Sequence, residues 1–218
     1  MKNRDYREFS QGNIYHIFNR GNNKENIFFC DQDYRAFLFR LALSMGFEIK
    51  DIKKEKLIFL PYSRMNITGT NKNNFKLHAF CLMPNHFHLL IEQCKDEPIS
   101  KLISKICTSY AMYVNKKYDR LGHLFQDQFK AVLIKDNPQL MWVSAYIHMN
   151  PVKDKIIKLP EQYEWSSYKD FIGERNLPIV SKDFLVELFE NQRSFKKETL
   201  SYFSKSDQIS GEIIDIDN

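Results

Sequence analysis

The stretch NFKLHAFCLMPNHFHLLIEQ, residues 74–93, decides how this chain folds. Two runs of apolar, largely aromatic and aliphatic residues flank the turn-forming pair Pro84-Asn85. This pattern predicts two adjacent antiparallel strands joined by a short turn. Pro84 does not suit the type I′ turn that most two-residue hairpins use, so the pattern leaves the strand register open.

Two histidines, His86 and His88, lie two residues apart in the second predicted strand. Side chains at i and i+2 point to the same face of a strand, so both imidazoles lie opposite the apolar face formed by Phe87, Leu89 and Ile91. Two imidazoles can converge on one metal ion, but a structural zinc site takes four ligands. The pair alone fits a histidine-rich patch in a half-buried sheet equally well, so partner residues elsewhere must decide.

The chain to about residue 175 supplies the other elements of an α+β domain. Apolar residues recur with strand or helix period, and helix-starting residues precede the helical runs. The predicted elements are a strand at 13–19, a helix at 32–47, a helix from 99 onward, a strand within 125–136, and a helix at 137–151 that Pro151 ends. The order strand–helix–strand–strand–helix–strand is that of a ferredoxin-like or RRM-like antiparallel sheet with helices on one face.

Two segments stand outside this pattern. Residues 51–73 mix a basic run, a proline and several asparagines, which indicates a loop or small insertion, and Leu57–Leu60 fits a short strand. Residues 176–218 form a C-terminal extension to the domain of residues 1–175. The extension has a short amphipathic helix near 182–191, and from 204 onward it has little to bury, which predicts a mobile tail.

The composition is that of a globular protein with a mild basic excess. The 218 residues carry a net charge of +5, which is compatible with a nucleic-acid partner without establishing one. The four cysteines form no C-x-x-C pair, no apolar segment marks a signal peptide, and no run reaches the length of a membrane span. We therefore expect a cytoplasmic protein with reduced thiols and no membrane partner.

A tyrosine four residues before an asparagine is a candidate pair for chemistry. The spacing occurs three times, at Tyr15/Asn19, Tyr62/Asn66 and Tyr146/Asn150. Only the last pair lies in a predicted helix, where i and i+4 share a face, so that Asn150 could offer an amide oxygen to a metal beside Tyr146. The competing interpretation is that Trp142 and Tyr146 are simply large packing residues.

Three blocks, taken together, resemble a known family. FCLMPNHFHLLIEQ, IYHIFNRGNNKENIF near the start and YIHMNPVKDKII later occur in the order found in the REP-associated tyrosine transposases, IS200-like members of the HUH endonuclease superfamily. The block GHLFQDQFKA also fits, and the resemblance covers about residues 10–170. One departure is Gln128, where relatives often carry an arginine.

The resemblance implies a fold, a chemistry and a substrate. It implies a ferredoxin-like sheet with the HUH motif on a central strand, a divalent metal, Mg²⁺ or Mn²⁺, held by His86, His88 and Asn150, and Tyr146 as nucleophile. The expected enzyme nicks and rejoins single-stranded DNA at hairpins, through a 5′-phosphotyrosine intermediate that leaves a free 3′-OH. It would act as a monomer or homodimer.

Other residues receive weaker assignments. The candidate DNA contacts are Asn19, Arg20, Lys116, Lys117, Arg120, Lys130 and Lys153. Three of them, Lys116, Lys117 and Arg120, lie at the end of a predicted helix, where basic residues also suit the helix dipole. Simple hairpin pairing places His78 on the face opposite His86. His148 lies two positions from Tyr146 on the predicted helix and so points about 200° away from it. His16 and His123 have no evident partners, and all three are assigned structural or surface roles. Tyr113 is the reserve nucleophile, whereas Tyr110 fits the core.

Three alternatives stay open. A non-catalytic single-stranded nucleic-acid-binding module of RRM-like fold would share the sheet but leaves the H-x-H pair unexplained. A replication initiator or relaxase would share only the metal motif. A metal-dependent hydrolase would use water in place of Tyr146.

Overall fold

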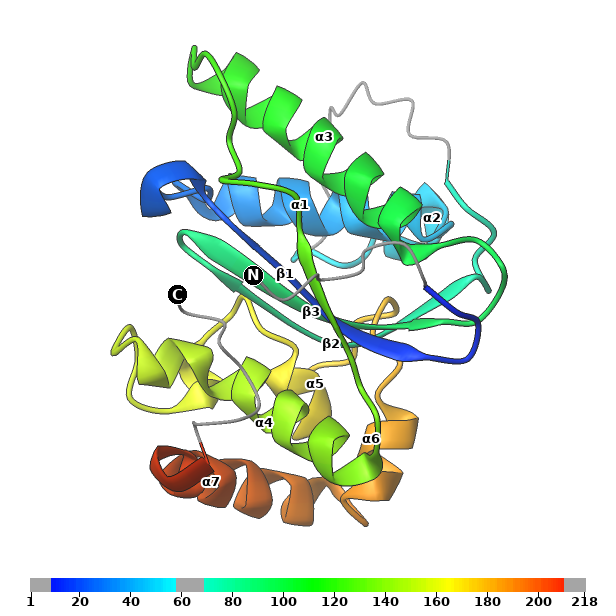
Figure 1. The fold of residues 1–218 in the computed structure, drawn as a ribbon, viewed down its shortest axis with the longest axis vertical. Helices are drawn as coiled ribbons and strands as arrows, with labels where there is room; N and C mark the ends of the chain where they lie inside the picture. Colours follow the sequence, from blue (N-terminus) through cyan, green and yellow to red (C-terminus); the bar gives the residue numbers. More distant parts are fainter. Residues whose placement is uncertain (1–8, 58–68, 210–218) are drawn as a thin grey trace.

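A four-stranded antiparallel sheet forms the centre of the protein (Figure 1). The computed structural model describes residues 9–57 and 69–209. The strands are β1 (Ile14–Arg20), β2 (Phe75–Met83), β3 (His86–Gln93) and β4 (Lys130–Leu133), in the order β2-β3-β1-β4. This is the sheet of a ferredoxin-like βαββαβ fold. The predicted α+β class with a ferredoxin-like antiparallel sheet is confirmed, and His86 and His88 lie on β3, one of the two central strands.

The hairpin between β2 and β3 has a two-residue loop, Pro84 and Asn85, with Met83 opposite His86. Neither loop residue has a positive φ, so the loop is not the type I′ turn that Pro84 disfavours. The Pro84 carbonyl accepts hydrogen bonds from the backbone N–H groups of Ile27 and Phe28, at 2.8 and 3.0 Å. These bonds fix the loop that immediately precedes the two histidines.

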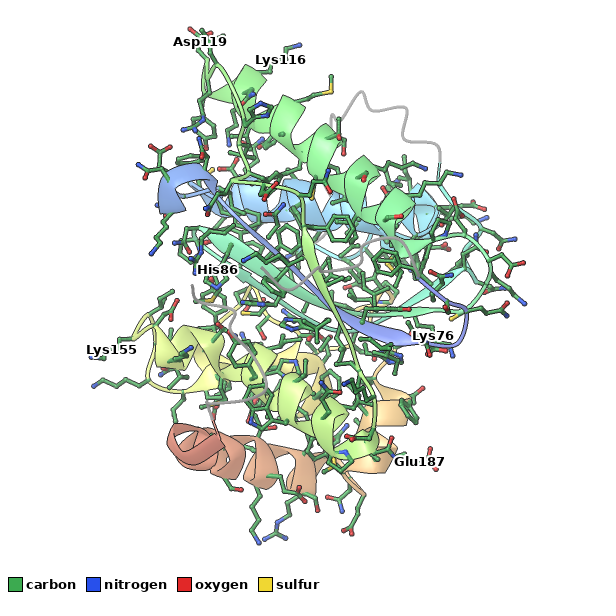
Figure 2. All side chains as sticks on the ribbon, in the orientation of Figure 1. Lys76, His86, Lys116, Asp119, Lys155 and Glu187 are labelled. Atoms are coloured by element: carbon green, nitrogen blue, oxygen red, sulfur yellow. The ribbon has the colours of Figure 1, made fainter. Side chains whose placement is uncertain are left out.

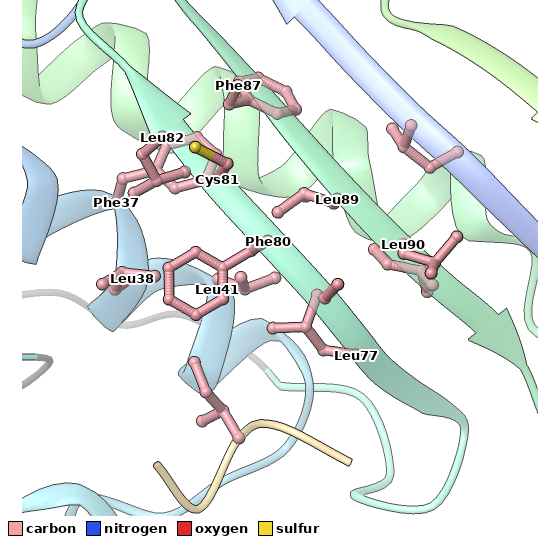
Figure 3. Packing of buried hydrophobic residues seen from close by; sticks show 14 of the residues in the cluster. Phe37, Leu38, Leu41, Leu77, Phe80, Cys81, Leu82, Phe87, Leu89 and Leu90 are labelled. Atoms are coloured by element: carbon pink, nitrogen blue, oxygen red, sulfur yellow. The ribbon is translucent and has the colours of Figure 1, made fainter. Parts of the chain in front are cut away.

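Helices cover both faces of the sheet, whereas the sequence predicted helices on one face only (Figure 1). Helices α1 (Asp31–Ser44) and α3 (Ile99–Lys117) pack together on one face. Their apolar side chains meet those of the hairpin, such as Phe37 against Phe87, with ring centroids 5.0 Å apart (Figure 3). Helix α4 (Asn137–Lys153) packs against β2 and β3 on the other face. His86, His88 and their neighbours on that face are therefore also buried.

Helix α4 continues past the predicted end at Pro151 to Lys153. Proline lacks one backbone N–H, but the next turn still closes, because the Asp154 N–H donates to the Asn150 carbonyl at 2.9 Å. The helix begins as expected: Asp136 caps it by accepting from the Gln139 N–H at 2.8 Å.

The segment after α4 folds back onto it and joins the same core. It comprises η2 (Pro160–Gln162), α5 (Tyr168–Phe171), α6 (Asp183–Leu188) and α7 (Gln192–Ile209). The extension therefore contains two helices where one near 182–191 was predicted, and the backbone of 204–209 is helical rather than part of a tail. The shorter elements η1 (Asn22–Lys24) and α2 (Ile49–Ile52) precede β2. Most of the expected Leu57–Leu60 strand, Tyr62/Asn66 and residues 210–218 lie outside the described residues.

An irregularity in β2 corrects the placement of His78. A register shift between Leu77 and Ala79 makes His78 the extra residue of a β-bulge. His78 Nε2 therefore lies 2.9 Å from Glu92 Oε2, and Glu92 shares the face of His86 and His88 rather than the opposite one.

Across the two described ranges, no helix is long and apolar enough to cross a membrane.

Candidate active site

The H-x-H pair and the helix tyrosine meet between β3 and α4. His86 and His88 are 8% and 1% exposed, on the face that α4 covers. The Tyr146 ring meets the His88 ring edge to face, with centroids 5.6 Å apart and planes at 85°. Trp142, one turn earlier on α4, stacks on Tyr146 at 5.4 Å and 10°. The structure thus joins two motifs that lie far apart in sequence, with Trp142 fixing the tyrosine ring. Figure 2 shows His86 at the end of the sheet, above α4.

Asn150 lies one turn beyond Tyr146 on the same helix and is 3% exposed. Its amide nitrogen donates to the Tyr146 carbonyl at 2.9 Å. Because this bond uses the nitrogen, the amide oxygen is the atom that can serve as a metal ligand.

Each histidine of the pair has its Nδ1 atom engaged. His86 Nδ1 lies 2.6 Å from the amide oxygen of Asn85, and His88 Nδ1 lies 3.0 Å from His16 Nε2. The Asn85 oxygen can only accept, so His86 carries its proton on Nδ1 and would coordinate through Nε2. His88 Nε2 is buried and has no hydrogen-bond partner among the described residues. A bound cation would supply that partner, so the residues present fit a divalent metal.

Burial keeps the imidazoles of His88 and His16 neutral, and the neutral imidazole is the form that binds metal. Desolvation lowers the pKa of His88 well below its usual value, and the nearby imidazoles of His86 and His16 further disfavour a proton there, because two adjacent charged rings would repel. Desolvation also lowers the pKa of His16 to about 3. No group of three or more His, Cys, Asp or Glu side chains that could hold a metal ion occurs among the residues described. A metal held here would therefore depend on the Asn150 amide in addition to the two histidines.

A cavity of about 200 Å³ opens beside the two histidines. It is lined by Phe18, Asn19, Arg20, Lys24, His86, His88, Gln126, Asp127, Gln128 and Lys130. Three predicted DNA contacts, Asn19, Arg20 and Lys130, border it, together with Gln128. The chain turns sharply after β1 at Gly21, where a Cβ would lie 2.1 Å from the Glu25 carbonyl oxygen, so only glycine fits.

The other predicted DNA contacts lie in different surroundings. The Lys153 ammonium is 5.5 Å from the centroid of the Tyr146 ring, beside the site. Lys117 pairs with buried Asp33 at 2.7 Å and Arg120 pairs with Glu25 at 3.3 Å. Lys116 is exposed at the outer end of α3, distant from His86 (Figure 2). Of this group, the structure brings only Lys153 next to the tyrosine.

The reserve tyrosine does not share the site. Tyr113 donates to Asp33 Oδ1 at 2.9 Å on the face of the sheet covered by α1 and α3. Tyr110 is fully buried and donates to the Ile27 carbonyl at 2.6 Å, a packing role as predicted. His123 is exposed and His148 bonds Ser167 at 2.8 Å, which agrees with surface and structural roles.

Two residues of the site were missed from the sequence. His16 was expected to lack a partner, but it contacts His88, and its Nε2 lies within hydrogen-bonding distance. Its position in the apolar strand 13–19 was the available signal, because a histidine there must be buried. Asn85 was read only as a turn residue. Its place directly before His86 was the signal that it could hold the imidazole.

Comparisons with known proteins show what the chain is similar to. The family model described as "Transposase IS200 like" matches residues 63–150, which include His86, His88, Tyr146 and Asn150. A putative REP-associated tyrosine transposase from Haemophilus influenzae is 28% identical over 105 residues. That match covers 43% of this chain and 59% of the relative.

The resemblance to the REP-associated tyrosine transposases is confirmed. A solved structure of a REP-associated tyrosine transposase bound to a REP hairpin has the same fold, with a TM-score of 0.55 and 17% identity. It covers 79% of this chain, and this chain covers 87% of it.

Proposed function

We propose that the protein is a metal-dependent transposase-like enzyme that nicks and rejoins single-stranded DNA through Tyr146. The observation that carries the proposal is the edge-to-face contact of Tyr146 with His88, inside a buried site that also holds Asn150. A packing tyrosine needs no such neighbours. A nucleophile does, because it must lie beside the groups that hold the scissile phosphate.

The residues that would hold a divalent cation are His86, His88 and Asn150. Two neutral imidazoles and an amide suit Mn²⁺ or Mg²⁺, with Mn²⁺ favoured by the imidazoles. Once bound, the cation would act as a Lewis acid toward the scissile phosphate and offset its developing charge. The role of the chain is to keep both rings neutral and fixed, and to leave the cavity open beside them.

Tyr146 would then form the covalent link. Its phenol oxygen forms a bond to phosphorus while the bond from phosphorus to the 3′ oxygen breaks. The phenol gives up its proton, the 3′ oxygen gains one, and a 5′-phosphotyrosine and a free 3′-OH result. A later 3′-OH reverses the step on the same ester and releases the tyrosine. The Lys153 ammonium, 5.5 Å from the ring centroid, is placed to attract the phosphate or the phenolate.

The substrate would be single-stranded DNA with a hairpin. The related transposase was solved with a REP hairpin, and its fold covers most of this chain. Arg20, Lys24 and Lys130 line the cavity beside the histidines, where phosphates of an unpaired strand would meet positive charge.

A labelled-strand assay tests the proposal. Hairpin DNA from the flanks of the gene, labelled at either end, is incubated with the protein and Mn²⁺ and run on a denaturing gel. Tyr146 becomes joined to the fragment downstream of the break, so the 3′-labelled strand should give a protein-linked band and the 5′-labelled strand a free shorter band. Tyr146→Phe should lose both bands, while Tyr113→Phe keeps them.

Other outcomes would change the assignment. Cleavage without an adduct would point to water as the nucleophile. Hairpin binding with neither product, for every flanking hairpin tried, would replace the enzyme by a non-catalytic binding module of RRM-like fold.

A further inference from the structure

His16 lies deep in the site although it is neither a predicted ligand nor a nucleophile. It sits on β1, where Phe18 is paired with His88 and His16 with Leu90, so His16 and His88 are diagonal neighbours on one face. Their rings stack with centroids 5.1 Å apart and planes at 25°. The centroid of the Tyr146 ring is 6.1 Å from that of His16, so the tyrosine contacts both histidine rings. His16 is fully buried, which a histidine tolerates poorly unless its nitrogens are used.

Either ring can be the donor in the hydrogen bond between His16 and His88. Two ring nitrogens 3.0 Å apart share one proton, so one of His16 Nε2 and His88 Nδ1 donates and the other accepts. If His16 donates, His88 carries its other proton on Nε2, where no acceptor lies among the described residues. If His88 donates, its Nε2 presents a lone pair instead, and His16 carries its own proton on Nδ1, which also has no partner among the described residues. Only the second arrangement lets His88 bind a cation.

We infer that His16 is a positioning residue for the metal site: it accepts the Nδ1 proton of His88 and so directs His88 Nε2 toward the cation. This inference rests on the proposed function. It gives His88 the same support that Asn85 gives His86, since each ligand then donates its Nδ1 proton to a fixed acceptor. Such partners fix the tautomer and ring orientation of a metal-binding histidine and raise its basicity.

Two substitutions at one position separate this role from packing. His16→Phe keeps a buried ring but removes the acceptor. His16→Gln places an amide oxygen close to the position of Nε2 and can accept the same proton. The matched control is His78→Phe, which removes another buried histidine of the same sheet, bonded to Glu92 at 2.9 Å but remote from Tyr146.

Mn²⁺ affinity, measured by calorimetry on the whole chain, is the readout, with thermal unfolding recorded for each variant. His16→Phe should weaken Mn²⁺ binding roughly 10- to 100-fold. His16→Gln should recover most of the loss, and His78→Phe should bind Mn²⁺ as the native chain does. A second readout is the exchange-protected imidazole N–H proton of His88 in the Mg²⁺-loaded protein, by NMR. It should persist in His16→Gln and vanish in His16→Phe.

Native Mn²⁺ affinity in a folded His16→Phe variant would overturn the inference and leave the proposed function intact. Equal losses in His16→Phe and His16→Gln, with the His88 proton unchanged, would also overturn it by showing a packing role. The metal site itself would be overturned if the native chain bound no Mn²⁺, or if His88→Ala left its Mn²⁺ affinity unchanged.

Discussion

The rings of Tyr146 and His88 meet edge to face, with their centroids 5.6 Å apart and their planes at 85°. One residue belongs to α4 and the other to the central strand β3, so the contact exists only once the helix has packed on the sheet. Trp142 stacks on the tyrosine at 5.4 Å and limits its rotation. The site therefore forms only when α4 packs on the sheet, and single substitutions can test the contribution of each residue.

Asn150 should contribute to metal binding. Asn150→Leu keeps the size of a buried side chain but removes the amide oxygen, the third ligand atom available beside the two histidines. We expect Mn²⁺ affinity to fall by about tenfold or more, as calorimetry would measure, because the loss of one ligand is not replaced. Asn115→Leu, in the last turn of α3 where the Asn115 amide donates to the Gly122 carbonyl, is the control and should bind Mn²⁺ normally. Unchanged affinity in Asn150→Leu would remove Asn150 from the site.

Much of this site can be predicted from residue spacing, and the rest depends on contacts across the sheet. The period of a strand places His86 and His88 on one face, and the period of a helix places Asn150 one turn from Tyr146. The contact of His16 with His88 follows from the register between β1 and β3, which spacing within either strand does not encode.

The same limit explains the errors in the fold. One extra residue in β2 moved His78 to the other face, and a bulge leaves no clear signal in an apolar run. Helix α7 was missed because its apolar residues are few, and Phe195 is buried by partners from distant elements, Phe171 among them at 4.7 Å. Tertiary packing, more than local propensity, stabilises that helix.

The extension should be integral to the stability of the domain. Phe195 is fully buried among Phe171, Phe189 and His148. Phe195→Ala should lower the free energy of unfolding by about 3–5 kcal/mol in urea titrations, because it leaves a cavity in the core. Phe184→Ala, at a side chain that is 45% exposed, should cost about 0.5 kcal/mol. A loss below 1 kcal/mol for Phe195→Ala would show that α7 is dispensable for the core.

The cavity beside the histidines should bind DNA more strongly than the outer end of α3. Arg20 lines the cavity, whereas Lys116 is exposed at the far end of α3. Arg20→Ala should weaken binding of a single-stranded hairpin and reduce the slope of log K against log salt by about 0.7, the value for one lost phosphate contact. Lys116→Ala should change the slope less. Equal effects, measured by fluorescence anisotropy from 50 to 200 mM salt, would place the binding surface on α3 as well.

Cys30 should be the fastest-reacting thiol of the chain. Desolvation raises its pKa, but hydrogen bonds from Tyr118, Lys117 and the Gln32 backbone outweigh this and hold the pKa below its ordinary value. The thiolate therefore forms at a lower pH than for a free cysteine, and the alkylation rate should reach its plateau earlier as pH rises. Burial raises the pKa of Cys81 well above the ordinary value, so Cys81 should stay unlabelled.

Lys117→Met provides the check on this order. It removes the ammonium group 3.2 Å from the Cys30 sulfur, so the pH at half-maximal iodoacetamide labelling should move upward. Mass spectrometry of the labelled peptides measures each site separately. An unchanged profile would mean that Lys117 does not stabilise the thiolate.

The identity of the nucleophile is the central claim, and peptide mapping of the covalent adduct tests it most directly. The protein is incubated with hairpin DNA and Mn²⁺, the adduct is digested with protease and nuclease, and the modified tyrosine is located by tandem mass spectrometry. We predict a nucleotide linked through its 5′ phosphate to Tyr146 and to no other residue. A nucleotide on Tyr113 or on any other tyrosine would contradict the account, because the contact between Tyr146 and His88 would then be packing alone.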